Sequence, residues 1–372
     1  MFRYSRWIII RAGALLLGIL LVAAYLYKDS IGDKINPLQE YVEKVSIQPK
    51  PFTKESFECQ QNLSVAKITG FDSFSPEIKN MLYYGHCRNF PVLLDLPDKC
   101  GGAEESADIF LLLVIKTSPP NYDRREVLRK TWAEERLYNG VWIRRIFIAG
   151  TAGDSFEEER WNALLKAEHE TYNDILQWDI KDSFVNLTLK QTLFLKWMER
   201  KCLHVHFLLN GDDDVFANTD NMVDYLQSLD NDGSKHLFTG FLMGGGPIRD
   251  SRSKYFVPVE MYPSNSYPLY CSGGGYLLSV YTALVIHKMS QTIDLIPIDD
   301  VYMGMCLTKA NLKPTRHMGV MTLGWKIPSS NLDQYDPCFF RNVLLVHRFF
   351  SANMYVLWKR IHDPNLKCGI SK

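Results

Sequence analysis

The chain has no excess of charge of either sign, because 42 Lys and Arg residues balance 42 Asp and Glu residues among its 372 residues. A protein that attracts a polyanion needs a positive excess, and no basic arm or RNA-binding signature is present. Nucleic acid is therefore not expected as a partner. The chain also lacks internal repeats and low-complexity tracts, and its 46% hydrophobic share is that of a globular protein with a large core.

Motifs of covalent catalysis and of zinc binding are missing as well. No Gly-x-Ser-x-Gly elbow is present, and none of the eight cysteines forms a Cys-x-x-Cys pair. An even number of widely spaced cysteines is typical of a disulfide framework in a secretory compartment, so we expect oxidised cysteines and no nucleophilic thiol. The spacing does not choose a pairing among Cys59, Cys87, Cys100, Cys202, Cys271, Cys306, Cys338 and Cys368.

A long apolar run lies near the N-terminus, at residues 7–27 (WIIIRAGALLLGILLVAAYLY). About 20 apolar residues cross a bilayer as a helix, and Arg11 is close enough to the start of the run to reach the headgroups. Two arginines precede the run, so the positive-inside rule places residues 1–6 in the cytosol. No small-x-small cleavage site follows Leu21, which favours an uncleaved type II signal anchor over a signal peptide.

The remainder of the chain divides by composition. Residues 28–58 carry three prolines among polar residues and are expected to form a stem. We expect residues 59–107 to be a disulfide-containing extension packed on the core, and residues 108–372 to be the catalytic domain. Asn62-Leu-Ser and Asn186-Leu-Thr are acceptor sequences for N-glycans, which are added only in the secretory lumen. Anchor, cysteines and glycan acceptors together predict a luminal protein.

Apolar runs alternate with amphipathic segments from residue 109 onward. This alternation predicts βαβ units and therefore an α/β fold with a mainly parallel sheet. In such sheets ligands bind beyond the carboxyl ends of the strands. The expected strands are residues 109–118, 144–150, 175–180 and 205–210, and the expected helices include residues 156–172 and 187–202.

Three consecutive carboxylates follow one of these strands, in LLNGDDDVFAN. In an extended segment Asp212 and Asp214 face one cleft while Asp213 faces elsewhere. Clustered carboxylates in a sheltered place are costly unless a cation bridges them, and Mg²⁺ or Mn²⁺ does so while leaving positions open for phosphate oxygens. The alternative is a solvated turn or a helix cap. Asn218 already provides a cap for the next helix, which favours a metal and diphosphate site.

A second acidic pair stands in IPIDDVYMGMCLTKANLKP. Asp299 is placed to cap a helix that runs to about Ala310, and Asn311 resembles a left-handed residue at its end. Asp300 then lies in the first turn. It either complements the helix dipole or acts as a general base toward an incoming hydroxyl, and this motif alone does not choose.

Three further patterns have both a structural and a functional interpretation. In YCSGGGYLLS, Gly273, Gly274 and Gly275 precede an expected helix and permit close approach of a ligand, although a plain loop explains them as well. In RREVLRKTW, Arg125 and Arg129 share a helix face that suits phosphate oxygens or a salt-bridged surface. The histidine in NVLLVHRF ends an apolar run, as a core residue or as a second metal ligand.

The chain resembles the luminal β-1,3-glycosyltransferases of family 31, and more closely their β-1,3-N-acetylglucosaminyltransferase members, over roughly residues 80–372. The resemblance rests on six blocks in a fixed order: RREVLRKTW, DSFVNLTLKQTLFLKW, LNGDDDVFANTDNM, YPLYCSGGGYLLS, PIDDVYMGMCL and DPCFFRNVLLVHRF. It implies a GT-A fold, a UDP-GlcNAc donor, Mn²⁺ (or Mg²⁺) as cofactor and inversion at the anomeric carbon.

The resemblance also implies a role for each matching residue. Asp214 and His347 would be the metal ligands, and Asp300 the catalytic base. The nucleotide and sugars would be bound by Asp212, Asp213, Gly273, Gly274 and Gly275. Apart from the resemblance, we expect Asp299 to belong to the same binding site, and Arg125 or Arg129 to stabilise charge on the leaving diphosphate.

The implied substrates are terminal galactose residues of glycans on glycoproteins or glycolipids, either poly-N-acetyllactosamine or mucin core 1 O-glycans. The implied location is the Golgi membrane, with the catalytic domain in the lumen. Two alternatives are a β-1,3-galactosyltransferase that uses UDP-Gal and a non-catalytic luminal glycan-binding protein. The latter predicts a disrupted Asp–Asp–His set, whereas every member is present. The sequence leaves open whether the chain forms homo-oligomers or hetero-oligomers with other glycosyltransferases.

Overall fold

The computed structural model describes most of the chain after residue 58. The described ranges are residues 59–101, 109–153, 155–322, 335–349 and 351–369. The expected cytosolic tail, signal anchor and stem, residues 1–58, lie outside the described residues. Within the described part, no helix is both long and apolar enough to span a membrane.

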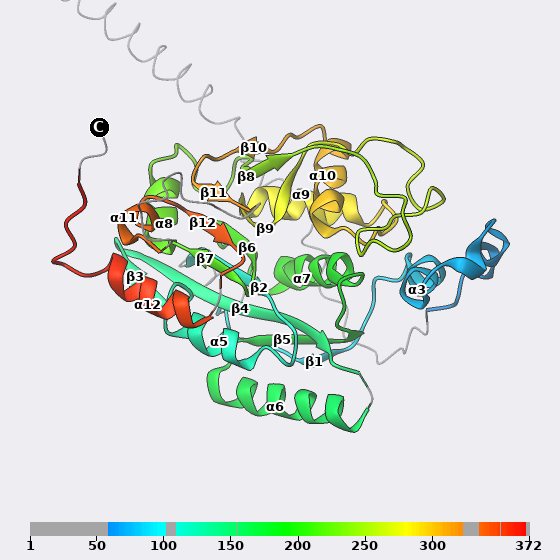
Figure 1. Cartoon of the computed structure of the whole chain (residues 1–372), viewed down its shortest axis with the longest axis horizontal. Coiled ribbons are helices and arrows are strands. Elements are labelled where there is room, and N and C mark those ends of the chain that lie inside the picture. The colour runs from blue at the N-terminus through cyan, green and yellow to red at the C-terminus, as the bar shows by residue number, and fades with distance from the viewer. Residues whose placement is uncertain (1–58, 102–108, 154, 323–334, 350, 370–372) are drawn as a thin grey trace, which may run out of the picture. The chain divides into compact units, whose positions relative to one another are not determined.

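A mixed nine-stranded sheet forms the centre of the described fold, in the order β1-β5-β4-β2-β6-β9-β8-β10 with β3 paired to β4 (Figure 1). The four strands β5, β4, β2 and β6 run parallel, as predicted, and β9 is antiparallel to both of its neighbours. The strands are β1 Val92–Leu94, β2 Ile109–Lys116, β3 Arg136–Tyr138, β4 Val141–Thr151, β5 Ile175–Lys181, β6 Phe207–Asp212, β8 Phe238–Met243, β9 Tyr270–Ser279 and β10 Thr315–Arg316.

Helices flank the sheet, which confirms the predicted α/β class (Figure 1). Helices α7, α9 and α10 pack against one another, and α5 packs against α12. The helices are α3 Pro76–Tyr84, α5 Tyr122–Arg129, α6 Phe156–Tyr172, α7 Leu187–Lys201, α8 Thr219–Gln227, α9 Val280–Ser290, α10 Asp299–Lys309, α11 Pro337–Phe340 and α12 Ser351–Ile361; the 3₁₀ turns η1 Leu63–Lys67 and η2 Phe71–Ser73 precede them.

Local sequence signals account for several element ends. Helix α6 begins and ends where predicted, because Ser155 and Glu158 form a capping box and Asn173 ends the helix in a left-handed conformation. Asn218 caps α8 as predicted, accepting from the backbone N–H of Asn221. Strand β2 is buried along almost its whole length, as expected for a strand covered on both faces.

A second, three-stranded sheet places the C-terminal strand β12 next to the aspartate run. It contains β7 Val215–Ala217, β12 Leu345–His347 and β11 Val320–Met321. Strand β12 pairs antiparallel with β7, and His347 lies opposite Val215, the residue that follows Asp214. This pairing brings together groups that are far apart in the sequence.

Six of the eight cysteines form disulfides, so the expectation that the cysteines are oxidised is correct for these six. The bonds are Cys59–Cys87, Cys100–Cys202 and Cys338–Cys368. Cys271 and Cys306 correct the expectation, because both are buried free thiols. Strand β1, which follows the first disulfide, pairs with β5 of the main sheet.

Candidate active site

A cavity of about 560 Å³ opens beyond the carboxyl ends of the parallel strands, where an α/β sheet binds ligands. Its walls come from segments that the sheet order brings together. They include Lys116 and Thr117 at the end of β2, Asp212, Asp213 and Asp214 at the end of β6, Gly273 and Gly274 in β9, Asp299 and Asp300 at the start of α10, and His347 at the end of β12.

Two carboxylates and one imidazole converge in this cavity. The Nε2 atom of His347 lies 3.3 Å from Oδ1 of Asp214 and 3.9 Å from Oδ2 of Asp212. Ligand atoms of all three residues lie within 4.8 Å of one another, a separation that one metal ion can bridge. The structure therefore brings Asp214 and His347 together as the sequence predicts, and it adds Asp212 to the set.

The orientation of the imidazole is fixed by a backbone group. Its Nδ1 atom lies 3.1 Å from the carbonyl oxygen of Thr322, and a carbonyl only accepts, so Nδ1 carries the proton. Nε2 then faces the carboxylates with a lone pair or with a second proton. A lone pair directed at two carboxylates is repulsive unless a cation lies between them.

The electrostatics of the cluster show the same demand for positive charge. Burial disfavours the imidazolium, yet Asp214 and Asp212 raise the pKa of His347 above its ordinary value. Burial likewise opposes ionisation of Asp214, but His347 and then Arg124 hold the pKa of Asp214 below its usual range. Burial raises the pKa of Asp212 in spite of the nearby lysine. A cation at this place would relieve all three groups.

Asp213 is not part of this group of three, but it lines the same cavity, which corrects the expectation that it faces elsewhere. A turn and not an extended strand sets its direction. Strand β6 ends at Asp212, and Asp213 and Asp214 form the turn before β7. The Asp213 carboxylate accepts from Thr117 Oγ1 at 2.6 Å, Asn121 Nδ2 at 2.8 Å and Arg124 Nη1 at 2.7 Å.

Asp300 lines the same cavity, at the N-terminus of α10. Burial, and then the negative charge of Asp299, raise the pKa of Asp300 to about 7. The prediction that Asp299 caps this helix is wrong, because residue 298 holds the cap position and makes no side-chain hydrogen bond. Asp299 instead pairs with Lys116 at 2.7 Å, inside the protein.

The three glycines lie within strand β9 and not in a loop before a helix, which corrects the expectation for this segment. A Cβ atom on Gly274 would lie 2.8 Å from Cγ of His347, and one on Gly275 would lie 2.5 Å from Cδ1 of Leu345. Side chains at both positions would displace β12 and its histidine. The absence of side chains thus serves the close packing of β9 against β12.

A family model described as Galactosyltransferase matches residues 123–318 of this chain. The chain belongs to this family. It is 49% identical to human N-acetyllactosaminide beta-1,3-N-acetylglucosaminyltransferase 3, covering 84% of this chain and 82% of that protein. It is 45% identical to a human acetylgalactosaminyl-O-glycosyl-glycoprotein beta-1,3-N-acetylglucosaminyltransferase over 83% of this chain and 80% of the relative.

A mouse relative and a solved structure also match this chain. Mouse UDP-GlcNAc:betaGal beta-1,3-N-acetylglucosaminyltransferase 7 is 40% identical over 84% of this chain and 78% of its own length. The structure of galactosyltransferase LgtC with donor and acceptor sugar analogues matches 67% of this chain and 95% of that chain. Its identity is 12% and its TM-score 0.33.

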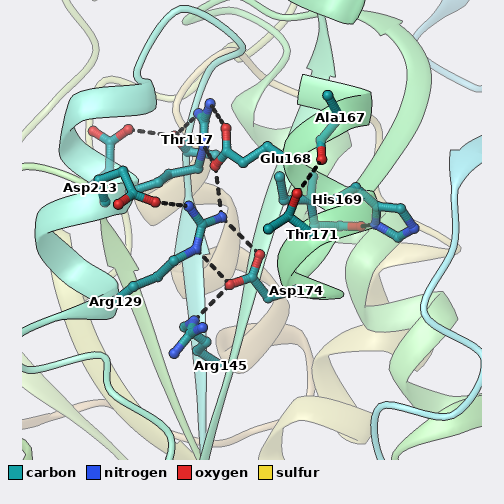
Figure 2. A network of polar contacts seen from close by, with 12 residues as sticks. Thr117, Arg129, Arg145, Ala167, Glu168, His169, Thr171, Asp174 and Asp213 are labelled. Carbon is teal, nitrogen blue, oxygen red and sulfur yellow. Dashed lines mark hydrogen bonds and ion pairs between the residues drawn. The ribbon is translucent and has the colours of Figure 1, made fainter. Parts of the chain in front are cut away.

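Arg125 and Arg129 do not reach the cavity in this galactosyltransferase-family chain, which corrects the prediction that one of them binds phosphate. Arg125 is fully buried and forms a two-point pair with Glu168. Arg129 contacts Asp174 and Glu168 (Figure 2). Both guanidinium groups are enclosed by carboxylates of α6 and of the segment after it, so neither is available to a ligand.

Sequence reasoning missed several polar residues of the cavity, including an arginine, two lysines and a threonine. Arg124, whose side chain is 42% exposed, is the arginine of α5 that lines it. Lys116 bridges Asp212 at 2.9 Å and Asp299 at 2.7 Å, and these carboxylates hold its pKa well above the usual value although burial opposes the charge. The other two are Thr117 and Lys190. A lysine that ends an otherwise apolar strand was the available signal for Lys116.

The two glycan acceptor sites lie outside this cavity. Asn62 is exposed at the start of η1, and its side chain accepts from Ser64. Asn186 precedes α7 and donates to the carbonyl oxygen of Lys181. The hydroxyl of Thr188 in the second site is buried and donates to Ile296. Glycosylation stays a prediction, and at Asn186 it would have to precede the folding of α7.

Proposed function

We propose that this chain is an inverting glycosyltransferase that moves N-acetylglucosamine from UDP-GlcNAc to the 3-hydroxyl of a terminal galactose. The observation that carries the proposal is the convergence of Asp212, Asp214 and His347 with Asp300 on one cavity. Relatives whose names state this β-1,3 transfer match most of the chain, and they support the choice of donor and linkage. The proposal includes a GT-A arrangement of the mixed sheet.

The residues present fit a divalent metal ion, Mn²⁺ first and Mg²⁺ as the alternative. Asp212, Asp214 and His347 would hold it, because carboxylate oxygens and a neutral imidazole are the donors that such ions accept. The Thr322 carbonyl supports this assignment, since it fixes the imidazole with Nε2 toward the carboxylates. When bound, the ion would neutralise charge that develops on the diphosphate leaving group.

Asp300 would accept the proton of the acceptor hydroxyl as that oxygen attacks the anomeric carbon. Its raised pKa keeps it near the pH at which a general base works efficiently. Lys116 would hold Asp212 and Asp299 in place, since it bridges the two carboxylates from inside the protein. Asp213 and Arg124 would form the wall of the cavity on the nucleotide side.

Golgi residence as a type II membrane protein is part of the proposal. The apolar run at residues 7–27 and the three disulfides support it. Protease protection of intact Golgi vesicles tests it. The described residues should be degraded only after the membrane is opened with detergent.

A transfer assay tests the activity and separates it from its alternatives. Full-length protein in detergent is incubated with Mn²⁺ and either UDP-GlcNAc or UDP-Gal. The acceptors are N-acetyllactosamine, a core 1 O-glycan, and matched compounds that lack the galactose 3-hydroxyl. We expect transfer from UDP-GlcNAc to the first two, and a β-1,3 linkage in the product. Transfer from UDP-Gal alone would replace the donor assignment, and binding of glycans without turnover would favour a non-catalytic protein.

A further inference from the structure

A buried ionic network lies close to the aspartate run and is connected through Thr117 to the middle aspartate, Asp213. It joins Arg145, Arg129, Asp174, Glu168 and Arg125 (Figure 2). The proposed reaction uses none of these residues. Their side chains are nonetheless connected to the cavity, and the connection is a single hydroxyl group.

Arg125 is the end of the network nearest to the cavity, and its guanidinium is fully engaged. Nε and Nη2 donate to Glu168 at 2.7 and 2.9 Å. The other N–H groups donate to the carbonyl oxygens of Ser118 and Pro119 and to Thr117 Oγ1 at 3.1 Å. An arginine has five N–H donors, and each has an acceptor here. The position of this side chain is therefore determined from every side.

The direction of the Thr117 hydroxyl follows from that contact. Arginine only donates, so Thr117 Oγ1 must accept from Arg125. Its single proton is then free for another acceptor, and Asp213 Oδ2 lies 2.6 Å away. Thr117 is 3% exposed and Asp213 is 5% exposed, so water does not compete for either bond.

Asp213 is the middle residue of three adjacent carboxylates that line the cavity, and the other two are candidate metal ligands. Such a turn tends to relax so that the charges separate, because like charges in a sheltered place repel. Thr117 and Asn121 hold one oxygen of Asp213, and Arg124 holds the other. Of the three donors, only Thr117 is itself held by the buried network.

We propose that Thr117 is a positioning residue, which transmits the fixed geometry of the Arg125–Glu168 pair to Asp213 and so holds the aspartate turn in its donor-binding form. The inference rests on the proposed function only in that the turn binds a nucleotide sugar. It assigns a role to the first residue after β2, and it explains why a buried ionic network adjoins the cavity without lining it.

Thr117→Val and Thr117→Ser test this role. Valine keeps the shape and removes the hydroxyl, whereas serine restores it. For Thr117→Val we expect the KM for UDP-GlcNAc to rise roughly tenfold, because a hydrogen bond to a charged group is lost, with little change in kcat or in the KM for the acceptor. Thr117→Ser should return the donor KM to within about twofold of the wild type.

Thr131→Val is the matched control, since that hydroxyl is also sheltered and bonds only within its own segment, to the carbonyl of Val127. It should lower Tm by a similar amount and leave the donor KM unchanged. A Thr117→Val variant whose Tm falls while its donor KM stays at the wild-type value would overturn the positioning role. In a double-mutant cycle with Asp213→Asn, the two effects on the donor KM should be non-additive, and additive effects would also overturn it.

A measurement without substrate separates this inference from the proposed function. Crystal structures of Thr117→Val and Thr117→Ser need neither nucleotide nor turnover. The Asp213 carboxylate should rotate away from residue 117 in the valine variant and keep its position in the serine variant. An unmoved Asp213 in Thr117→Val would contradict the inference even if the enzyme transfers N-acetylglucosamine. Rotation in a protein without transferase activity would contradict only the proposed function.

Discussion

Two ionic clusters lie next to each other in this protein, and they differ in charge balance and exposure. The closed cluster pairs Arg125, Arg129 and Arg145 with Glu126, Glu168 and Asp174, and the side chains of its arginines are largely buried. The open cluster lines the cavity and contains five carboxylates. Among the described residues, two permanently charged side chains pair with them, and the His347 imidazole is a third partner that titrates. The members of the open cluster are Asp212, Asp213, Asp214, Asp299 and Asp300, with Lys116 and Arg124.

The difference shows which cluster serves structure and which serves function. Three arginines facing three carboxylates need nothing more, because each buried charge has a partner of opposite sign. Five carboxylates that face two permanent cations and one imidazole carry an excess of negative charge when they are all ionised. Burial, and then the charge of Asp299, raise the pKa of Asp300, as expected where negative charge is not fully balanced. We therefore expect the open cluster to be the one that a ligand completes.

The first prediction concerns Asp300, the carboxylate of the open cluster that has no ion-pair partner among the described residues. Asp300→Asn should lower kcat by about 10²–10⁴-fold, because an amide cannot accept the proton of the acceptor hydroxyl. UDP binding in the presence of Mn²⁺, measured by isothermal titration, should stay within about twofold of the wild type. A variant that turned over at the wild-type rate would remove Asp300 from the reaction.

Paired substitutions of two arginines on α5 sharpen the contrast between the clusters. Arg129→Met leaves Asp174 and Glu168 short of a buried partner and should cost about 3–5 kcal/mol of unfolding free energy. Arg124→Met, at a half-exposed side chain, should cost less than about 1 kcal/mol but weaken UDP binding roughly tenfold. Urea denaturation and titration calorimetry measure the two effects. Equal stability losses would mean that the two clusters do not differ as described.

Periodicity and capping were enough to predict the four parallel strands β2, β4, β5 and β6 of the main sheet and several of the helices. Helix α6 is the clearest case, because Ser155, Glu158 and Asn173 mark both ends within the segment itself. The glycine strand β9 was mistaken for a loop, since three glycines are typical of loops. Its conformation depends on packing against Leu345 and His347, some 70 residues away in the chain, and no local pattern reports such a contact.

The candidate site was predictable where the chemistry of one residue type sufficed. The acidic run by itself indicated a metal site, the resemblance to the family indicated Asp214 and His347 as its ligands, and the structure brings these two side chains together. The sequence did not show which of Arg124, Arg125 and Arg129 lines the cavity. Neighbouring helix residues point about 100° apart, and Arg125 points away from the cavity because it pairs with Glu168 of α6. Lys116 escaped notice because it completes an apolar run and its partner carboxylates come from β6 and α10.

Removal of the proposed metal ligand Asp214 tests whether a cation completes the open cluster. Asp214→Ala should weaken Mn²⁺-dependent UDP binding by roughly 100-fold, since the cluster loses an oxygen donor next to His347. Titration of the wild type in EDTA should show similarly weak binding. If the variant and the wild type bind UDP equally with and without Mn²⁺, the cluster does not hold a metal.

The pH dependence of activity tests whether the pKa of Asp300 is raised as the structure indicates. The pKa of Asp300 is raised to about 7, so the base is protonated below that pH and ionised above it. For the wild type, kcat/KM should therefore fall about tenfold per unit as the pH drops below about 7. A bound cation would lower the pKa of Asp300 and so move the fall in kcat/KM to lower pH. Activity would still decrease as the pH decreases.

Stability of the metal-free protein should change with pH in the opposite direction. A carboxyl whose pKa rises from 3.8 in the unfolded chain to about 7 in the folded one holds its proton more tightly when folded. Its contribution to stability is complete below about pH 4, declines as the pH rises, and is lost above about pH 7. Asp300→Asn has no such titration, so in EDTA its Tm should exceed that of the wild type by a margin that grows by roughly a few degrees between pH 5 and pH 8. A margin that stays constant would mean that the charge on Asp300 is already balanced within the protein. The open cluster would then not differ from the closed cluster in charge balance.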